Sequence, residues 1–304
     1  MFKPPSRFAG KVLENGLMWP APPPIRRRSS TYCGYGLTRQ ESLQQHPRRL
    51  VVFMKTKQPD NTQMNGTWEN YAEFKTNNSL SARYYAFVTA CFKAGIKAVA
   101  GTGHFENALD IACGTGDNTL LVADHARAVT GIDLSHEQIK KAQSNPALNH
   151  IRFEKADFLS YLPDGKYGLI TAVWFHNYIH NGTDQRKVAE KIATALTENG
   201  AVVFLFPSDS FTRTKTKDYF ARLNWQQAWY EHQADLARGV FSFQGSPWDT
   251  MTCWQPLFLF ETYHPYFELH FLDTKKLCVE MGFLDESYLN PTFEVMYGRK
   301  REGL

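Results

Sequence analysis

The chain has 304 residues, of which 43% are hydrophobic and 21% charged, the balance of an ordinary globular protein. No stretch approaches the roughly 20 uninterrupted apolar residues of a membrane-spanning helix, so we expect no membrane segment. The five cysteines are scattered without the spacing of a metal site, and we therefore expect reduced thiols in a cytoplasmic protein.

The first part of the chain differs in composition from the rest. Residues 1–57 hold eleven basic and two acidic residues, and "WPAPPPIRRRSS" has neither a helical nor a strand period. Prolines and like charges oppose packing, so we predict that residues 1–63 are a disordered basic extension and that residues 64–304 form the folded domain. Three interpretations of the extension stay open: a mitochondrial transit peptide, an arm for anionic partners, or a segment before a true start at Met54 or Met64.

Strands and helices then alternate along the chain. Helical segments are predicted within residues 67–96, and apolar runs predict strands at 108–112, 128–132, 151–154, 167–174 and 201–206. Amphipathic segments between these strands predict helices at 117–125, 135–143 and 184–196. Ser135 is the expected N-cap of the second helix, and Gly200 is the expected end of the third. Continuous apolar strands that alternate with helices predict a parallel sheet covered on both faces.

The alternation stops after the fifth strand. Residues 208–270 are rich in Trp, Tyr and Phe, with mixed helical and extended signals. We interpret them as a lid insertion over a planar or apolar small molecule, and such a lid also needs a hydrophobic core of its own. A helix is predicted at 274–281 and strands at 283–289 and 293–299. The three-residue connection between these strands makes them antiparallel.

The stretch "ALDIACGTGDNT" (residues 108–119) joins the first strand to the next helix. Such a turn offers backbone N–H groups and the positive end of a helix to a ligand, and Gly114 and Gly116 permit it. Asp133 ends the second strand, where a carboxylate can accept hydrogen bonds from ribose hydroxyls. Thr119 stands where a dinucleotide site has its third glycine, and Asp110 suits a cation or amine better than a pyrophosphate. A nucleoside cofactor with an amino-acid tail therefore fits better than NAD.

Four segments resemble, in order and spacing, the class I S-adenosylmethionine-dependent methyltransferases: "LDIACGTGDNT", "VTGIDLS", "FEKADFLSYLP" and "YGLITAVWFHNYI". In addition, "ENYAEFKTNNSLSAR" and "FHNYIHN" are similar to segments of the toxoflavin-synthase-like group of small-molecule methyltransferases. The resemblance implies an α/β, doubly wound, Rossmann-like fold with a seven-stranded, mostly parallel sheet and an antiparallel last strand. It also implies N-terminal helices before the sheet and S-adenosylmethionine as the cofactor.

The resemblance also implies roles for matching positions. Asp110 and the glycine turn would lie beside the methionine moiety, Asp133 would hold the ribose, and Leu134 and Asp157 would contact the adenine. Trp174 would form the bottom of the site near the sulfonium. The implied cofactor-binding residues are Tyr71, Arg83, Asp110, Ala112, Gly114, Gly116, Asp133, Leu134, Asp157, Phe158 and Trp174.

Methyl transfer depends on orientation of the reactants and exclusion of water more than on a protein nucleophile. His176 is the candidate base for a hydroxyl or amine acceptor, with Tyr178 and His180 nearby; the alternative is a loop histidine with a structural role. No pair of acids has the spacing of a metal site, so we expect no metal.

The leading interpretation is therefore a methyltransferase acting on an O or N atom of a small, planar or apolar molecule, without a nucleic-acid partner. The alternatives are an RNA or protein methyltransferase that uses the basic arm, a non-catalytic module that binds S-adenosylmethionine, and a nicotinamide-dependent oxidoreductase. The oligomeric state stays open.

Overall fold

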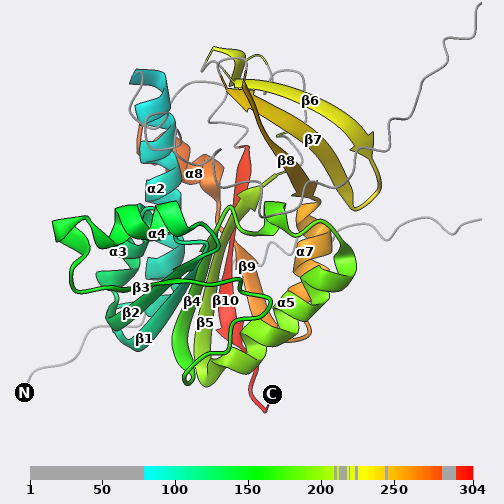
Figure 1. The fold of residues 1–304 in the computed structure, drawn as a ribbon. Helices are drawn as coiled ribbons and strands as arrows, with labels where there is room; N and C mark the ends of the chain where they lie inside the picture. Colours follow the sequence, from blue (N-terminus) through cyan, green and yellow to red (C-terminus); the bar gives the residue numbers. More distant parts are fainter. Residues whose placement is uncertain are drawn as a thin grey trace, which may run out of the picture. The chain divides into compact units, whose positions relative to one another are not determined.

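Seven strands form the main sheet of the protein in the order β3-β2-β1-β4-β5-β10-β9 (Figure 1). The computed structural model describes residues 79–208, 211, 218, 220–222, 225–243, 246–282 and 292–303. The strands are β1 (Phe105–Ile111), β2 (Ala126–Asp133), β3 (Arg152–Lys155), β4 (Tyr167–Val173), β5 (Leu196–Pro207), β9 (Phe267–Phe271) and β10 (Phe293–Lys300). Strands β1 to β5 are parallel, and β10 is antiparallel to both β5 and β9. The predicted sheet, mostly parallel with an antiparallel last strand, is confirmed.

Helices cover both faces of this sheet (Figure 1). One face carries α2 (Ser79–Ala100), α3 (Asp117–Ala123) and α4 (His136–Gln143), and α8 (Thr274–Glu280) packs against α2. The other face carries α5 (Gly182–Ala195) and α7 (Pro256–Tyr263). Short 3-10 turns, η2 (Pro146–Leu148) and η3 (His176–Tyr178), complete the connections.

The sheet divides the hydrophobic core into two layers because successive side chains of a strand point to opposite faces. In β5, Ala201, Val203 and Leu205 pack with α2 on one face. The residues between them, Val202, Phe204 and Phe206, pack with α5 and α7 on the other face. All six are buried. A central strand with both faces covered explains the continuous apolar run that predicted it.

The local signals for helix α4 are confirmed, whereas the predicted end of α5 is wrong. Ser135 caps α4, since its Oγ accepts a hydrogen bond from the Gln138 backbone N–H at 3.3 Å. Helix α5 ends before Leu196, and Gly200 lies inside β5. Leu196 is buried and pairs with Tyr167 of β4. The chain therefore enters β5 at Leu196, four residues before the glycine that was expected to end the helix.

The segment predicted as a lid contains a second sheet. Strands β6 (Trp225–His232), β7 (Leu236–Phe243) and β8 (Ser246–Trp254) form an antiparallel sheet, here called the small sheet. Buried hydrogen bonds tie it to the loop after β4: Trp254 Nε1 donates to the carbonyls of His176 (3.1 Å) and Ile179 (2.9 Å). The small sheet therefore contacts the main fold through Trp254 at the end of β8.

The end of the predicted insertion belongs to the main sheet. Residues 256–263 form α7, and Phe267–Phe271 form the outermost strand β9. The predicted helix at 274–281 is confirmed as α8, while the predicted strand at 283–289 and the extension at 1–63 lie outside the described residues. Among the helices that the structure describes, none combines the length and apolarity needed to cross a membrane.

Candidate active site

The carboxyl ends of β1 and β4 carry unusual backbone conformations. Ala112 follows β1 with φ of 58°, and Trp174 follows β4 with φ of 60°. Both values lie in the left-handed region, which costs a residue other than glycine about 1–3 kcal/mol. β1 and β4 are neighbours at the point where the strand order reverses, the place where parallel α/β sheets bind ligands. Backbone strain therefore coincides with the topological position of a binding site.

The glycine turn and Asp133 are joined by direct hydrogen bonds. Asp133 Oδ2 accepts from the backbone N–H of Gly114 at 2.9 Å, and Oδ1 accepts from that of Ser135 at 2.8 Å. Burial raises the pKa of Asp133, and these two hydrogen bonds oppose the rise. Each carboxylate oxygen keeps a second lone pair, so the half-buried side chain can still accept from ribose hydroxyls.

The two glycines of the turn meet different surroundings. A Cβ on Gly116 would lie 2.6 Å from Leu148 Cδ1 and 2.9 Å from Phe153 Cζ, and φ is 85°. A Cβ on Gly114 would meet nothing nearer than Gln138 Oε1 at 3.8 Å, and φ is 55°. Gly116 is thus required by packing within the protein, whereas no described residue fills the space at Gly114.

Asp110 is a buried carboxylate held by two threonines. Its oxygens accept hydrogen bonds from the hydroxyls of Thr119 and Thr171, each at 2.7 Å, and the residue is 1% exposed. Burial raises the pKa of Asp110 to about 6, although both hydroxyls oppose the rise. The carboxylate therefore joins β1 to β4 and α3. A contact between Asp110 and the methionine moiety stays a prediction.

The residues predicted at the adenine differ in accessibility. Leu134 is 45% exposed directly after β2, so an apolar surface is available beside Asp133. Asp157 is exposed, and its Oδ1 accepts from the backbone N–H of Leu159 at 3.0 Å. The Phe158 ring, by contrast, is buried against Phe175 at a centroid distance of 5.8 Å. Phe158 as a whole is 3% exposed, and its predicted contact with the cofactor stays a prediction.

Two predicted residues lie on the N-terminal segment. Tyr71 is outside the described residues. Arg83 is exposed on the first turns of α2. Its predicted reach to the cofactor carboxylate stays a prediction.

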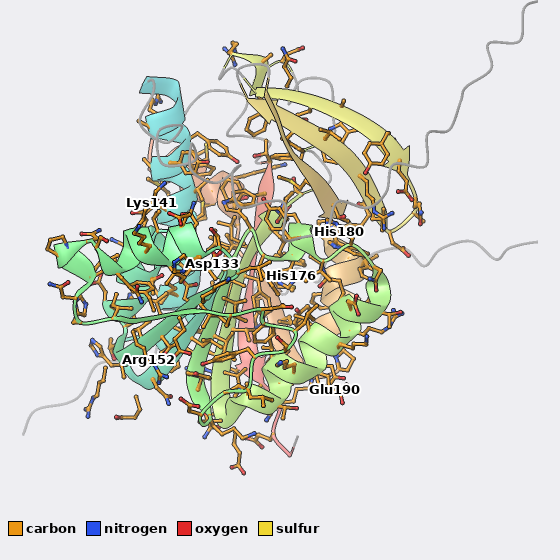
Figure 2. The ribbon with its side chains drawn as sticks, viewed as in Figure 1. Asp133, Lys141, Arg152, His176, His180 and Glu190 are labelled. Carbon is orange, nitrogen blue, oxygen red and sulfur yellow. The ribbon has the colours of Figure 1, made fainter. Side chains whose placement is uncertain are left out.

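His176 lies in the core between the main sheet and helices α5 and α7 (Figure 2). Its Nδ1 is 3.1 Å from Gln185 Oε1, and its Nε2 has no partner among the described residues. The ring is fully buried, with Phe204 and Tyr263 at centroid distances of 5.0 and 5.5 Å. Burial lowers the pKa of His176 to about 4, so the imidazole is neutral at physiological pH. We correct the predicted base role, because this ring is closed to substrate.

A row of aromatic rings leads from β4 to the small sheet, with neighbouring centroids 4.9–6.2 Å apart. Its members are, in spatial order, Trp174, Phe293, Tyr84, Phe220, Phe211, Phe241 and Trp229. The two ends, Trp174 and Trp229, are only half-buried. The sequence shows that residues 208–270 are rich in aromatic side chains, but it does not show which rings contact one another. The pairing of β6 with β7 is what places Trp229 at the end of the row.

Comparisons with known proteins agree with this geometry. Residues 108–200 match the methyltransferase domain family. The trans-aconitate 2-methyltransferase of Sinorhizobium medicae is 30% identical over 105 residues, which cover 34% of this chain and 38% of that relative. The chain thus matches well under half the length of this curated relative.

Solved structures share the fold at low sequence identity. An S-adenosylmethionine-dependent methyltransferase from Clostridium acetobutylicum has a TM-score of 0.54 at 17% identity, with 78% of this chain and 99% of that chain covered. CalS10, an amino pentose methyltransferase from Micromonospora echinaspora solved with S-adenosylmethionine bound, has a TM-score of 0.51 at 12% identity, with 77% and 96% covered.

The strand order, the glycine turn after β1 and the carboxylate after β2 define a Rossmann-like fold, in which ligands bind at the carboxyl edge of the sheet. With the family match, residues 108–200 are similar to methyltransferase domains, and they lie in a fold shared with S-adenosylmethionine-dependent methyltransferases of known structure.

Proposed function

We propose that the protein transfers a methyl group to an O or N atom of a small, planar or apolar molecule. The observation that carries this proposal is the pair of half-buried indoles, Trp174 after β4 and Trp229 in β6, which end a row of aromatic rings whose other members are buried in the core. Aromatic walls favour planar or apolar ligands because they offer large apolar contact area in a fixed shape.

The turn after β1 and the end of β2 fit the cofactor. Asp133 would hold the ribose hydroxyls, the open space at Gly114 would admit the cofactor beside the backbone, and exposed Leu134 would pack on the adenine. When bound, S-adenosylmethionine supplies a methyl group on a positively charged sulfur. The protein orients the acceptor and excludes water, which lowers the barrier without a nucleophile of its own.

The residues after β4 and in the small sheet, where we place the methyl acceptor, offer aromatic contacts but few groups that could transfer a proton. His176 is enclosed, and His180 is half-buried with its Nδ1 2.8 Å from Thr252 Oγ1. We therefore propose that the acceptor atom is nucleophilic in its ordinary ionisation state, such as a carboxylate or a neutral amine, or loses its proton to water.

The test combines cofactor binding with methyl transfer. Calorimetry should give a micromolar dissociation constant for S-adenosylhomocysteine, about −8 kcal/mol. Tritiated S-adenosylmethionine, incubated with separate panels of aromatic acids, conjugated acids, phenols and amines, should label at least one class. Binding of S-adenosylhomocysteine without labelling of any panel would count against a small-molecule acceptor. No binding at all would remove the proposed function.

The basic arm favours a second candidate, methylation of RNA or a protein. Comparison of the full chain with residues 64–304 separates the two. We expect both forms to bind S-adenosylhomocysteine equally and to label the same small molecules. Labelling of total RNA or denatured protein by the full chain alone would favour the second candidate.

A further inference from the structure

Trp229 lies flat on the middle strand of the small sheet. The register of β6 and β7 pairs Trp229 with Gly239, and Gly239 pairs in turn with Met251 of β8. A Cβ on Gly239 would lie 2.8 Å from Trp229 Cε3 and 2.9 Å from Cδ2. The six-membered ring of the indole therefore occupies the space that any other residue at position 239 would fill.

Neighbouring groups hold this indole in one orientation. The rings of Phe241 and Phe211 meet it at 88° and 86°, with centroid distances of 5.6 and 6.2 Å. Its Nε1 donates to Gln227 Oε1 at 3.1 Å. The indole stays half-buried despite these contacts. It is thus a rigid aromatic surface and not a freely rotating side chain.

The amide of Gln227 has one end in use and one end without a partner. An indole N–H can only donate, so the amide oxygen must face Trp229 and the NH2 group must point away from it. That Nε2 atom is buried and has no acceptor among the residues that the structure describes. A buried donor without an acceptor is destabilising, so its position beside an aromatic surface indicates a ligand atom that accepts the hydrogen bond.

Packing of an aromatic ring over a strand glycine also stabilises a sheet by itself. That effect explains the position of the indole on Gly239. It does not explain why the hydrogen-bond partner of the indole leaves a buried NH2 group unpaired.

We propose that Trp229 and Gln227 together recognise the methyl acceptor, and that they select a planar group carrying an oxygen that accepts hydrogen bonds, such as a conjugated carboxylate or carbonyl. This inference rests on the proposed function. It assigns the flat ring of the acceptor to the indole and the oxygen to Gln227 Nε2. It narrows the acceptor from any planar or apolar molecule to a planar one with an accepting oxygen.

Calorimetry on the full chain saturated with S-adenosylhomocysteine tests the two contacts separately. The probes are 2-naphthoate, which is planar, and decahydro-2-naphthoate, which has the same carboxylate on a puckered ring system. We expect the native protein to prefer 2-naphthoate about tenfold, the range that stacking on an aromatic side chain provides.

Four variants give a pattern that general loss of structure would not. Trp229→Leu should remove the preference for the planar probe, and Trp229→Phe should keep most of it. Gln227→Leu should weaken both probes by about fivefold and leave their ratio unchanged. Gly239→Ala should act like Trp229→Leu, because its methyl group displaces the indole while both recognition side chains remain.

Tyr230→Ala is the matched control, since Tyr230 is the next residue along β6 and is 60% exposed. The inference is overturned if the native protein binds neither probe, if Trp229→Leu keeps the preference, or if Tyr230→Ala removes it. Binding of S-adenosylhomocysteine in the same titrations separates the two proposals. If it binds and the probe pattern fails, only the recognition surface is wrong. If it does not bind and the pattern holds, the surface stands and the proposed function is wrong.

Discussion

The buried carboxylate of Asp110 should make the stability of this protein depend on pH in a direction opposite to that of a salt-bridged acid. Its pKa rises from an ordinary 3.8 to about 6 in the folded chain, chiefly through burial. The folded state therefore binds the proton more tightly than the unfolded chain. Stability that is present below pH 3.8 is lost as the pH rises to about 6.

The magnitude follows from the size of the shift. A shift of about two units at about 1.4 kcal/mol per unit gives a loss of about 3 kcal/mol across this window. Asp110→Asn does not titrate, and its amide can accept from one threonine hydroxyl and donate to the other. We expect this variant to be at least as stable as the native protein at pH 7 and to lose its relative advantage near pH 4.

The assay is urea unfolding at several pH values between about 4 and 7.5, for the native protein and the Asp110→Asn variant. The control is Asp124→Asn, which removes an exposed carboxylate that has no ion pair among the described residues; its profile is compared with that of Asp110→Asn. Parallel profiles for Asp110→Asn and the native protein would refute the argument, because the carboxylate would then titrate alike in both states. S-adenosylhomocysteine affinity at pH 7 adds a second result. An unchanged value assigns Asp110 to the fold, and a tenfold loss assigns it to the cofactor.

Three further predictions concern the site and its support. Asp133→Ala should weaken S-adenosylhomocysteine binding by about 1.5–3 kcal/mol, measured by calorimetry, because the ribose loses a charged acceptor and the Gly114 N–H loses its partner. Gly116→Ala should cost about 2–4 kcal/mol of stability in urea unfolding, through its clash with Leu148 and its positive φ, whereas Gly114→Ala should cost only about 1 kcal/mol; equal costs would contradict the distinction between the two glycines. Trp254→Ala should cost about 3–5 kcal/mol of stability with S-adenosylhomocysteine affinity intact at temperatures where the variant is folded, because this buried indole fills core volume and donates to two carbonyls.

Strands β1, β4 and β5 could be predicted because each contains a continuous apolar run next to a clear helix signal. In such a fold the side-chain pattern of one strand depends little on its partners, since both faces are covered. The small sheet could not be predicted in the same way. Its strands mix polar and aromatic residues, and the pairing of Trp229 with Gly239 depends on a register shift between Trp229 and Glu231. Register between strands is information that a single segment does not carry.

The candidate base failed for a related reason. His176 is the predicted base and His180 lies four residues further on after the same strand, but the local sequence does not show which of the two side chains enters the core. The 3-10 turn η3 directs His176 into the layer of α5 and α7, where Gln185 contacts both its Nδ1 and its carbonyl. A turn of three residues decides which side chain enters the core, and its direction is set by packing and not by local propensity.

The glycine motif shows what the spacing of residues in a sequence does not reveal. Gly114 and Gly116 appear equivalent in the sequence, because both allow a positive φ and a tight turn. Their surroundings separate them. Leu148 of η2 and Phe153 of β3 fill the space beside Gly116, while among the described residues the nearest atom to a Cβ on Gly114, Gln138 Oε1, is 3.8 Å away. Two glycines of one binding motif can thus be needed for different reasons, one because a ligand lies beside it and the other because core side chains do. Only the atoms around each glycine tell which is which, and the two alanine variants measure that difference directly.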